Sequence, residues 1–468
     1  MTPKERMALP CQDMPEQEAA VRAHNMKEVA LGYSAEQAMA EAKRCMQCPT
    51  KPCMQGCPVA INIPGFLAKA AEGDFDGALK IIKETSLLPA VCGRVCPQEK
   101  QCQKNCTMGK LLKSVDKAVA IGRVERYCAD HADAGEVKCA PKTGKKVAIV
   151  GSGPAGITCA ADCAKAGHDV TLFEAFHKAG GVLVYGIPEF RLPKSIVQKE
   201  IDGLKKLGVK VETNYCVGRT RKVSDFITKD GFDAVFVGTG AGLPKFMNIP
   251  GENLVGVFSA NEYLTRANLM KAYLDGQVDT PYWHGKKVAV LGGGNVAMDA
   301  SRMALRLGAE HVYLIYRRSL EEMPARKEEV HHAKAEGVDF LMLQNAKAIH
   351  GDDQGKVAGM TCVKFELGEP DASGRRSPVE IPGSEFELDV DTVVVAVGNA
   401  SNPLIPATTE GLEVNKRGNI VVNPETNMTS IPGVFAGGDI VLGAATVILA
   451  MGEGRRAAAG ITEYLKTK

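Results

Sequence analysis

Cysteine spacing constrains the N-terminal part of this 468-residue chain more than any other feature. Of its fifteen cysteines, eight lie between residues 45 and 106, and a ninth, Cys128, follows them. Their spacing is C-x2-C-x4-C-x3-C and then C-x3-C-x5-C-x3-C. Thiolate sulfur is a ligand of iron clusters and of zinc, so eight thiolates predict two four-cysteine sites. The eight are Cys45, Cys48, Cys53, Cys57, Cys92, Cys96, Cys102 and Cys106.

Composition and charge exclude several classes of protein. An apolar fraction of 45% lets a chain of this length bury two or three separate cores. The formal net charge of +2 argues against nucleic-acid binding, which normally requires a strongly basic surface. The N-terminus lacks an apolar signal core, and no window approaches the roughly twenty apolar residues that span a bilayer. We therefore expect a cytoplasmic protein without membrane contact, in which clustered cysteines bind metal instead of forming disulfides.

Residues 1–140 are expected to form an all-α domain. Ser34 and Gln37 have the spacing of a capping box, and an alanine-rich stretch follows them. Helical patterns recur on both sides of the cysteine loops, so these loops are expected between short helices instead of strands. Pro141 and Gly144 indicate a linker to the next domain.

The runs KKVAIV and KKVAVL, which begin at Lys145 and Lys286, form an internal repeat. Each enters a glycine loop and then an alanine-rich helix, which is the order of a nucleotide-binding half. The first loop reads G-x-G-x-x-G, and an acid ends the next strand at the separation expected for a ribose hydroxyl. A tight turn without a ligand is the alternative. The predicted contacts are Gly151, Gly153, Pro154, Ala155, Gly156 and Glu174.

Two later segments, GTGA after an apolar strand and AGGD before a helix, complete an order typical of flavoproteins with two dinucleotide sites. We expect an α/β fold with two Rossmann-like, glutathione-reductase-like domains behind the helical one. Residues 141–241 and 398–468 would bind FAD, and the inserted residues 242–397 would bind NADP(H). The acid of AGGD would accept hydrogen bonds from flavin-chain hydroxyls, with an ordinary helix N-cap as the alternative. The residues expected at the flavin are Gly238, Gly240, Gly438, Asp439 and Thr446.

The second glycine loop, GGGNVA, has alanine in its third position, where close packing still tolerates a methyl group. Strand HVYLIY ends in Arg317 and Arg318, and two guanidinium groups there would pair with a ribose 2′-phosphate. NADPH is therefore favoured over NADH, with a solvated basic strand end as the alternative. His331 and His332 are expected to be surface residues. The loop contacts are Gly292, Gly294, Asn295, Val296 and Ala297.

Motifs along the whole chain carry a family resemblance: CMQCPTKPCMQGCP, LPAVCGRVCPQEKQCQKNC, GSGPAG, GGGNVAMD and AGGDIVLGAATVILAMGEGR. With them the chain resembles the glutamate synthase small-subunit superfamily and the N-terminal half of dihydropyrimidine dehydrogenase. GGVLVYGIPEFRLPK and RANLMKAY most resemble the large subunits of NADH-dependent reduced ferredoxin:NADP oxidoreductases. These are flavin-based bifurcating transhydrogenases, also called sulfide dehydrogenase alpha.

The resemblance implies two [4Fe-4S] clusters, with a carboxylate in place of one cysteine as the eighth ligand. Cys92 would then be a bystander, and a carboxylate is a reasonable hard donor to iron. The spacing alone leaves zinc and the eight-cysteine arrangement open. The implied ligands are Cys45, Cys48, Cys53 and Cys106 for one cluster, and Cys57, Cys96, Cys102 and Glu125 for the other.

The resemblance also implies a reaction. NADPH would pass hydride to FAD, close to Gly181, Pro188 and Glu189 of the GGVLVYGIPEFRLPK segment. One electron would travel through the clusters to ferredoxin, and the other would go to a smaller ferredoxin reductase-like flavoprotein subunit that reduces NAD. Hydride transfer needs no acid, base or nucleophile, so no catalytic residue is expected. The alternatives are the small subunit of NADPH-dependent glutamate synthase and a non-catalytic iron–sulfur assembly subunit.

Basic residues are concentrated between Arg94 and Arg126. Eight of them stand against three acidic residues, which gives this stretch a net charge of +5. Such a patch beside a cluster would steer an acidic ferredoxin, and a solvated helical face is the alternative.

Overall fold

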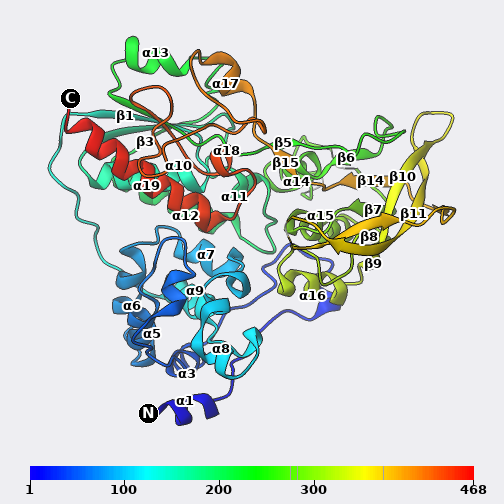
Figure 1. Cartoon of the computed structure of the whole chain (residues 1–468), viewed down its shortest axis with the longest axis horizontal. Coiled ribbons are helices and arrows are strands. Elements are labelled where there is room, and N and C mark those ends of the chain that lie inside the picture. The colour runs from blue at the N-terminus through cyan, green and yellow to red at the C-terminus, as the bar shows by residue number, and fades with distance from the viewer. Residues whose placement is uncertain (275, 282, 373) are drawn as a thin grey trace.

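A helical region and two parallel five-stranded sheets make up the protein (Figure 1). The computed structural model describes all residues except 275, 282 and 373. The helices of the N-terminal region lie at the lower left of Figure 1, the first sheet above them and the second sheet at the right. The expected fold class is therefore confirmed. Within the described residues, no helix is both long enough and apolar enough to cross a membrane.

Short helices joined by cysteine-containing loops form the N-terminal region, as expected. The Ser34 hydroxyl accepts from the Gln37 N–H, and the Gln37 side chain accepts from the Ser34 N–H, so the predicted capping box is present. Asn62 and Asp74 cap two further helices through their side-chain oxygens. The elements are α1 (Pro3–Ala8), α2 (Ala19–Arg22), α3 (Ala35–Lys43), α4 (Pro52–Gln55), α5 (Ile63–Ala71), α6 (Phe75–Lys83), α7 (Pro89–Val95), η1 (Gln98–Lys100), η2 (Gln103–Asn105), α8 (Thr107–Leu111), η3 (Val115–Lys117) and α9 (Ile121–His131).

The first sheet has the strand order β16-β4-β1-β2-β3. Its last strand comes from the C-terminal segment, which returns to pair in parallel with β4. Helices cover both faces, so its central strands are continuous apolar runs. The strands are β1 (Lys146–Val150), β2 (Asp169–Phe173), β3 (Lys210–Glu212), β4 (Ala234–Val237) and β16 (Val434–Ala436). The helices are α10 (Pro154–Lys165), α11 (Val182–Tyr185), α12 (Lys194–Lys206), α13 (Val223–Thr228), α17 (Leu404–Thr408), α18 (Asp439–Leu442) and α19 (Val447–Leu465).

The second sheet has the order β6-β14-β7-β8-β9, and an antiparallel arm of four strands extends from it at the right of Figure 1. A two-stranded pair, β5 with β15, joins the chain segments that connect the two sheets. The division at residues 140, 241 and 398 stays a prediction. The elements are β5 (Leu243–Pro244), β6 (Val257–Ser259), α14 (Ala260–Asn268), β7 (Lys287–Leu291), α15 (Asn295–Arg306), β8 (His311–Tyr316), α16 (Lys327–Ala335), β9 (Asp339–Met342), β10 (Gln344–Gly351), β11 (Val357–Pro370), β12 (Arg376–Glu380), β13 (Phe386–Leu388), β14 (Thr392–Val395) and β15 (Asn399–Ala400).

The N-terminal arm, residues 9–33, runs beside α16 of the second sheet (Figure 1). Buried ion pairs attach it to helices of this sheet. The Glu336 carboxylate pairs with Arg22 of the arm at 3.1 Å, with Arg302 of α15 at 2.8 Å and with Arg306 at 2.7 Å. The side chains of Glu336 and Arg302 have no solvent-exposed surface. The arm thus supplies one positive charge, that of Arg22, to an ion-pair network whose other members belong to helices of the second sheet.

The segment between α11 and α12 enters the same junction. The Phe190 ring lies under the Arg302 and Arg306 guanidinium groups, at 4.7 and 3.8 Å, and its carbonyl accepts from the Val29 N–H of the arm. His332 of α16 is also buried here and contacts Glu16 of the arm at 2.9 Å. The expectation that His332 is a surface residue is therefore wrong, because a partner distant in sequence covers it.

Replacing Arg302 by alanine removes one partner from each of two buried carboxylates, Glu329 and Glu336. We expect Arg302→Ala to destabilise the protein by about 3–5 kcal/mol, because removing one member of a buried ion-pair network is far more costly than losing a surface pair. Arg266→Ala is the matched control, since it removes an exposed pair to Glu262 on α14 and should cost about 0.5 kcal/mol or less. Urea unfolding of the two variants measures the difference. Equal midpoints would contradict this account of the junction.

Candidate functional site

The first glycine loop packs closely against neighbouring backbone at two of its glycines and faces open space at the third. A Cβ at Gly151, whose φ is +97°, would lie 2.5 Å from the Gly238 carbonyl oxygen. A Cβ at Gly156 would lie 1.9 Å from the Gly151 oxygen, so the helix that follows packs directly against the turn. At Gly153 a Cβ would meet nothing within 4 Å. That open space at the N-terminus of α10 is a cradle suited to a pyrophosphate.

The two acids predicted at this cradle are Glu174 and Asp439. The Glu174 carboxylate is buried, and it accepts hydrogen bonds from the backbone N–H groups of Ser152 and Phe176 at 3.1 and 2.9 Å. Asp439 is the first residue of α18, whose N-cap is Gly438, so the alternative of an N-cap aspartate is wrong. Burial raises the pKa of Asp439 to about 6. That either carboxylate binds a dinucleotide stays a prediction.

Residues of the GGVLVYGIPEFRLPK segment line the same region. A Cβ at Gly181 would lie 2.7 Å from the Gly153 Cα, which shows how closely the segment approaches the loop. Pro188 is buried, and the Glu189 carboxylate accepts from the Lys194 N–H. Tyr185 was missed by sequence reasoning, although it lies in this motif. Burial raises its pKa to about 12, with a further contribution from the nearby Asp439 charge.

A cavity of about 630 Å³ lies in front of the second glycine loop. Arg317 reaches this cavity and makes no ion pair among the described residues. Arg318 also borders it, but its Nε donates to the Arg376 carbonyl at 2.8 Å and its Nη2 to Asp371 at 2.7 Å. Of the predicted loop residues, Gly292, Gly294, Asn295 and Val296 line the cavity, whereas Ala297 is buried behind it.

Four cysteines of the N-terminal region stand around one small cavity. Cys45, Cys48, Cys53 and Cys106 share its wall with apolar side chains from α5 and α9. Burial raises the pKa of Cys45 to about 11 and that of Cys53 to about 12. Thiolates at such positions need a cation to stabilise them, which is what an iron cluster provides.

A second group consists of Cys57, Cys96, Cys102 and Glu125. Burial, with smaller contributions from the neighbouring charges of Glu125 and Cys96, raises the pKa of Cys57 to about 11. Glu125, on α9, is buried, and its Oε1 has no hydrogen-bond partner. Burial raises its pKa to about 8. An acid buried among thiols without a donor fits a position beside a metal centre.

The two groups do not converge on a single point. Among the described residues, no three His, Cys, Asp or Glu side chains are arranged to hold one metal ion. In a cluster of four irons each ligand binds a different iron, so its ligands are spread around the cluster. The thiol and carboxyl groups of each set are of the chemical types that bind the irons of such a cluster.

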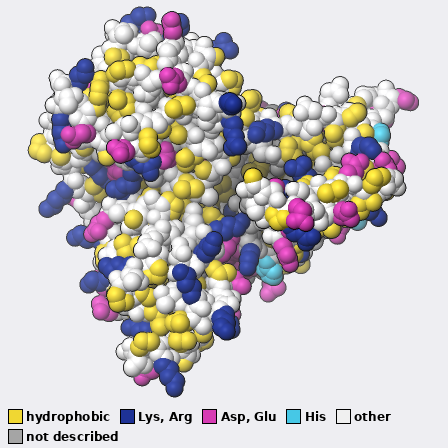
Figure 2. Space-filling view, in the orientation of Figure 1, with side chains coloured by type: hydrophobic (Ala, Val, Ile, Leu, Met, Phe, Trp, Pro, Cys, Tyr) yellow, Lys and Arg dark blue, Asp and Glu magenta, His cyan; other side chains and the backbone are white. Residues whose placement is uncertain are grey.

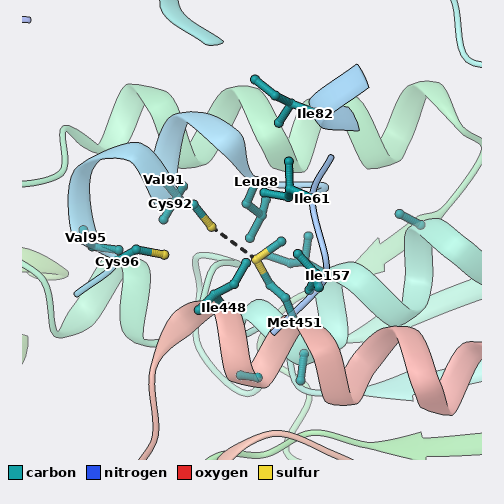
Figure 3. Packing of buried hydrophobic residues seen from close by; sticks show 14 of the residues in the cluster. Ile61, Ile82, Leu88, Val91, Cys92, Val95, Cys96, Ile157, Ile448 and Met451 are labelled. Atoms are coloured by element: carbon teal, nitrogen blue, oxygen red, sulfur yellow. Dashed lines mark hydrogen bonds between the residues drawn. The ribbon is translucent and has the colours of Figure 1, made fainter. Parts of the chain in front are cut away.

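Cys92 borders the second group, since its thiol interacts with that of Cys96, and it also points towards Met451 of α19 (Figure 3). Its thiol contacts the Met451 thioether of α19 at 3.6 Å, among Leu88, Val91 and Ile448. It is almost wholly buried in this apolar contact between α7 and α19. Such a contact is typical of a small hydrophobic residue, and the choice between Cys92 and Glu125 as the eighth ligand stays a prediction.

Helix α19 brings the second group close to the first glycine loop. The Gln101 amide, next to Cys102, donates to the Thr446 hydroxyl that caps α19, at 3.4 Å. A Cβ at Gly452 would lie 3.3 Å from the carbonyl of Pro58, which follows Cys57. The second group is thus packed against the helix whose N-terminus adjoins Asp439.

The second glycine loop also contacts the cysteine region. The Arg326 N–H donates to the Asn295 side chain at 2.9 Å, and its guanidinium donates to the Arg94 carbonyl at 2.7 Å. Lys100 donates to the Pro324 carbonyl at 2.6 Å. Residues 324–326 thereby join the nucleotide loop to the loop before Cys102, a role that no local sequence pattern indicates.

The basic stretch of residues 94–126 is only partly a surface patch. Arg94 and Arg126 are nearly buried and pair with Glu28 and Asp130. Arg123 pairs with Glu328 at 3.4 Å. The basic residues of this stretch that stay exposed are Lys100, Lys104, Lys110, Lys113 and Lys117.

Two protein-family models match the chain. Residues 22–137 match the model for dihydropyrimidine dehydrogenase domain II with its 4Fe-4S cluster. Residues 145–454 match the pyridine nucleotide-disulphide oxidoreductases. The first match favours iron over the zinc that cysteine spacing left open.

Similar proteins include several oxidoreductase subunits. The glutamate synthase [NADPH] small chain of Azospirillum brasilense is 39% identical, with 98% of this chain and 95% of that protein aligned. The NADP(+)-dependent formate dehydrogenase subunit beta of Moorella thermoacetica is 42% identical, with 89% of this chain aligned but only 60% of that protein. The NADPH-Fe(3+) oxidoreductase subunit beta of Geobacter sulfurreducens is 37% identical over 89% and 64%. This chain thus spans less than two thirds of the last two proteins.

Among solved structures, FprA from Mycobacterium tuberculosis has a similar fold, with a TM-score of 0.58 at 21% sequence identity. The alignment covers 69% of this chain and 85% of FprA.

Two glycine substitutions distinguish the role of the first loop in stability from its role in nucleotide binding. We expect Gly156→Ala to destabilise the protein by about 1–3 kcal/mol even without a nucleotide, because the added methyl overlaps the Gly151 carbonyl. Gly153→Ala should leave unfolding unchanged, since its φ of −67° suits alanine and the site is open. It should nevertheless reduce bound dinucleotide at least about tenfold, because the methyl blocks the pyrophosphate. Chemical unfolding and chromatography of released nucleotide test both; full nucleotide content in Gly153→Ala would disprove the cradle.

Proposed function

The chain belongs to the glutamate synthase small-chain family of FAD- and NAD(P)-dependent iron–sulfur oxidoreductases, and we propose that it is an NADPH-oxidising subunit for ferredoxin reduction. Through FAD and two [4Fe-4S] clusters it supplies electrons to ferredoxin and to a smaller partner flavoprotein that reduces NAD, by flavin-based electron bifurcation. A flavin accepts the two electrons of a hydride together and releases them one at a time, and this is the chemistry that FAD adds when bound.

The observation that carries this proposal is the arrangement of sites. The second group packs against α19, the helix that begins close to Asp439 and contacts α10 of the first glycine loop. The first group lies in the same helical region, and the second glycine loop lines a cavity of its own. This set of neighbouring sites supports the transfer of electrons from a nucleotide through a flavin to the clusters.

The proposed ligands of the two clusters are the two groups described above. Cys57, Cys96 and Cys102 supply thiolates to the second cluster, and Glu125 supplies the carboxylate. Supporting this choice, the Glu125 Oε1 has no other partner, whereas the Cys92 thiol contacts Met451. Asp439, Glu174 and the first loop are proposed to hold FAD.

A lysine-bearing surface near the first group suits an acidic electron carrier. Four lysines, Lys104, Lys110, Lys113 and Lys117, are exposed on the segments that flank Cys106. Cys48 is the least enclosed cysteine of the first group, since the other three are buried. An acidic ferredoxin would be steered to this surface, and steering of this kind weakens with added salt.

The electron acceptors that NADPH oxidation requires test this proposal. Purified with its partner from the native source, the protein is expected to oxidise NADPH only when NAD and ferredoxin are present together. The isolated chain should reduce an artificial dye with NADPH, which would exclude the non-catalytic assembly subunit. Activity that requires glutamine and 2-oxoglutarate instead would contradict the proposal.

The second candidate is the small subunit of NADPH-dependent glutamate synthase. It is favoured by alignment over nearly the full length of both chains with the Azospirillum brasilense protein. The same nucleotide and cluster residues would serve it, and only the partner would differ. Co-purification distinguishes the two candidates, because a glutamate-forming partner and a ferredoxin reductase-like partner differ in activity.

Substitutions at the eighth ligand position test the second cluster. The wild-type protein should contain about eight irons, and Glu125→Ala should fall towards about four or change the electron paramagnetic resonance of one cluster. Glu125→Gln should retain more iron, because it keeps an oxygen donor. Cys92→Ser is the control and should keep both clusters. Loss of a cluster in Cys92→Ser with none in Glu125→Ala would reverse the assignment, and zinc in place of iron would overturn both clusters.

A further inference from the structure

Two side chains from different segments contact sulfurs of the first cysteine group. The Gln47 amide donates to the Cys45 Sγ at 3.5 Å, and the Thr107 Oγ1 lies 3.1 Å from the Cys48 Sγ. In the free thiol, the Cys48 S–H donates to the Thr107 hydroxyl. A thiolate bound to iron has no proton, so the same contact then requires the hydroxyl to donate. Both side chains are therefore placed to give a hydrogen bond to a cluster ligand.

The fold holds both donors in place. The Gln47 amide also donates to the Pro64 carbonyl at 2.9 Å, and the Gln47 backbone is left-handed, with a φ of +50°. This conformation is unfavourable for a residue other than glycine, and strained residues of this kind are concentrated at functional sites. Thr107 is the first residue of α8 and directly follows Cys106. Its position is therefore fixed by the ligand that precedes it and by the helix that follows.

The cavity of the first group is otherwise poor in hydrogen-bond donors. Among its described lining residues, Thr107 is the only one with a hydroxyl, amide or charged side chain. A hydrogen bond is electrostatically stronger in such apolar surroundings than in water. Gln47 is exposed and its contact is longer, so we expect a smaller effect from Gln47 than from Thr107. In the second group, the sulfurs of Cys57 and Cys102 accept from backbone N–H groups instead.

We propose that Gln47 and Thr107 are positioning residues that act through Cys45 and Cys48, and that their hydrogen bonds raise the reduction potential of the first cluster. Reduction adds negative charge to a cluster and its sulfurs, so a donor stabilises the reduced form more than the oxidised form. Removing a donor therefore lowers the potential. This inference rests on the proposed iron–sulfur clusters, and it adds two residues that determine how readily one of them accepts an electron.

Variants that remove one donor at a time test the proposal. Thr107→Val keeps the shape of the side chain without its hydroxyl, and Gln47→Met keeps the length without the amide. Thr107→Val should lower the equilibrium constant for one-electron reduction of one cluster about tenfold, which corresponds to about 59 mV. Gln47→Met should lower it less, at the same cluster, and the second cluster should keep its potential. Electron paramagnetic resonance of the purified protein, poised at a series of potentials, measures both clusters.

Two further variants serve as controls. Thr107→Ser restores the hydroxyl and should keep the wild-type potential, which distinguishes hydrogen bonding from packing. Gln103→Met removes an amide that donates to the Val119 carbonyl at 3.1 Å, in the wall of the same cavity, and should also leave the potential unchanged. Iron content verifies that each variant holds its clusters. Gln47→Met changes an exposed residue, so it decides the proposal if Thr107→Val fails to bind iron.

Three outcomes would overturn the proposal and leave the clusters standing. They are an unchanged potential in a donor-free variant with full iron content, an equally lowered potential in Thr107→Ser, and equal shifts at both clusters. A wild-type protein that contains no iron would instead overturn the proposed clusters themselves.

Discussion

Guanidinium and carboxylate groups without access to water fix the second sheet to the rest of the molecule. Arg302 and Glu336 lie wholly inside the junction, and Arg22 reaches them from the N-terminal arm. Buried charges are costly to desolvate, and the cost is offset only when all partners are present with good geometry. The arm, the segment around Phe190 and helix α15 therefore assemble together. Since α15 begins at the second glycine loop, this assembly sets where a nucleotide lies relative to the first sheet.

Features with local causes could be predicted from the sequence. The capping box at Ser34 and the two strand–glycine–helix units depend on residues a few positions apart, and the structure has all three. The ion partners could not be predicted, because they lie far away in the chain. Arg318 meets Asp371 across 53 residues, and His332 meets Glu16 across 316. No periodicity indicates which carboxylate a given basic side chain will find.

The cysteine region shows the same division. Spacing indicates that thiolates gather there, but eight cysteines at metal-like intervals do not reveal which sulfur faces a cluster. Packing adds what spacing lacks: Cys92 contacts Met451 as well as Cys96, whereas Glu125 is enclosed without a hydrogen-bond donor for its Oε1. Similarly, the charge of residues 94–126 overstates the basic surface, because Arg94 and Arg126 are paired inside the protein. A count of charges in the sequence cannot distinguish a surface lysine from an internal arginine.

Helix α19 is engaged in several directions within a single turn. Met451 contacts the helical region, Glu453 accepts from Asn427, and Gly454 leaves room for the Ala155 carbonyl of the first loop helix. Adding or deleting one residue would rotate everything beyond it by about 100° and break these contacts together. Insertions and deletions in this turn are therefore expected to disrupt the structure, whereas surface loops elsewhere are free to lengthen. The length of this turn therefore sets the spacing between the second cysteine group and the first glycine loop.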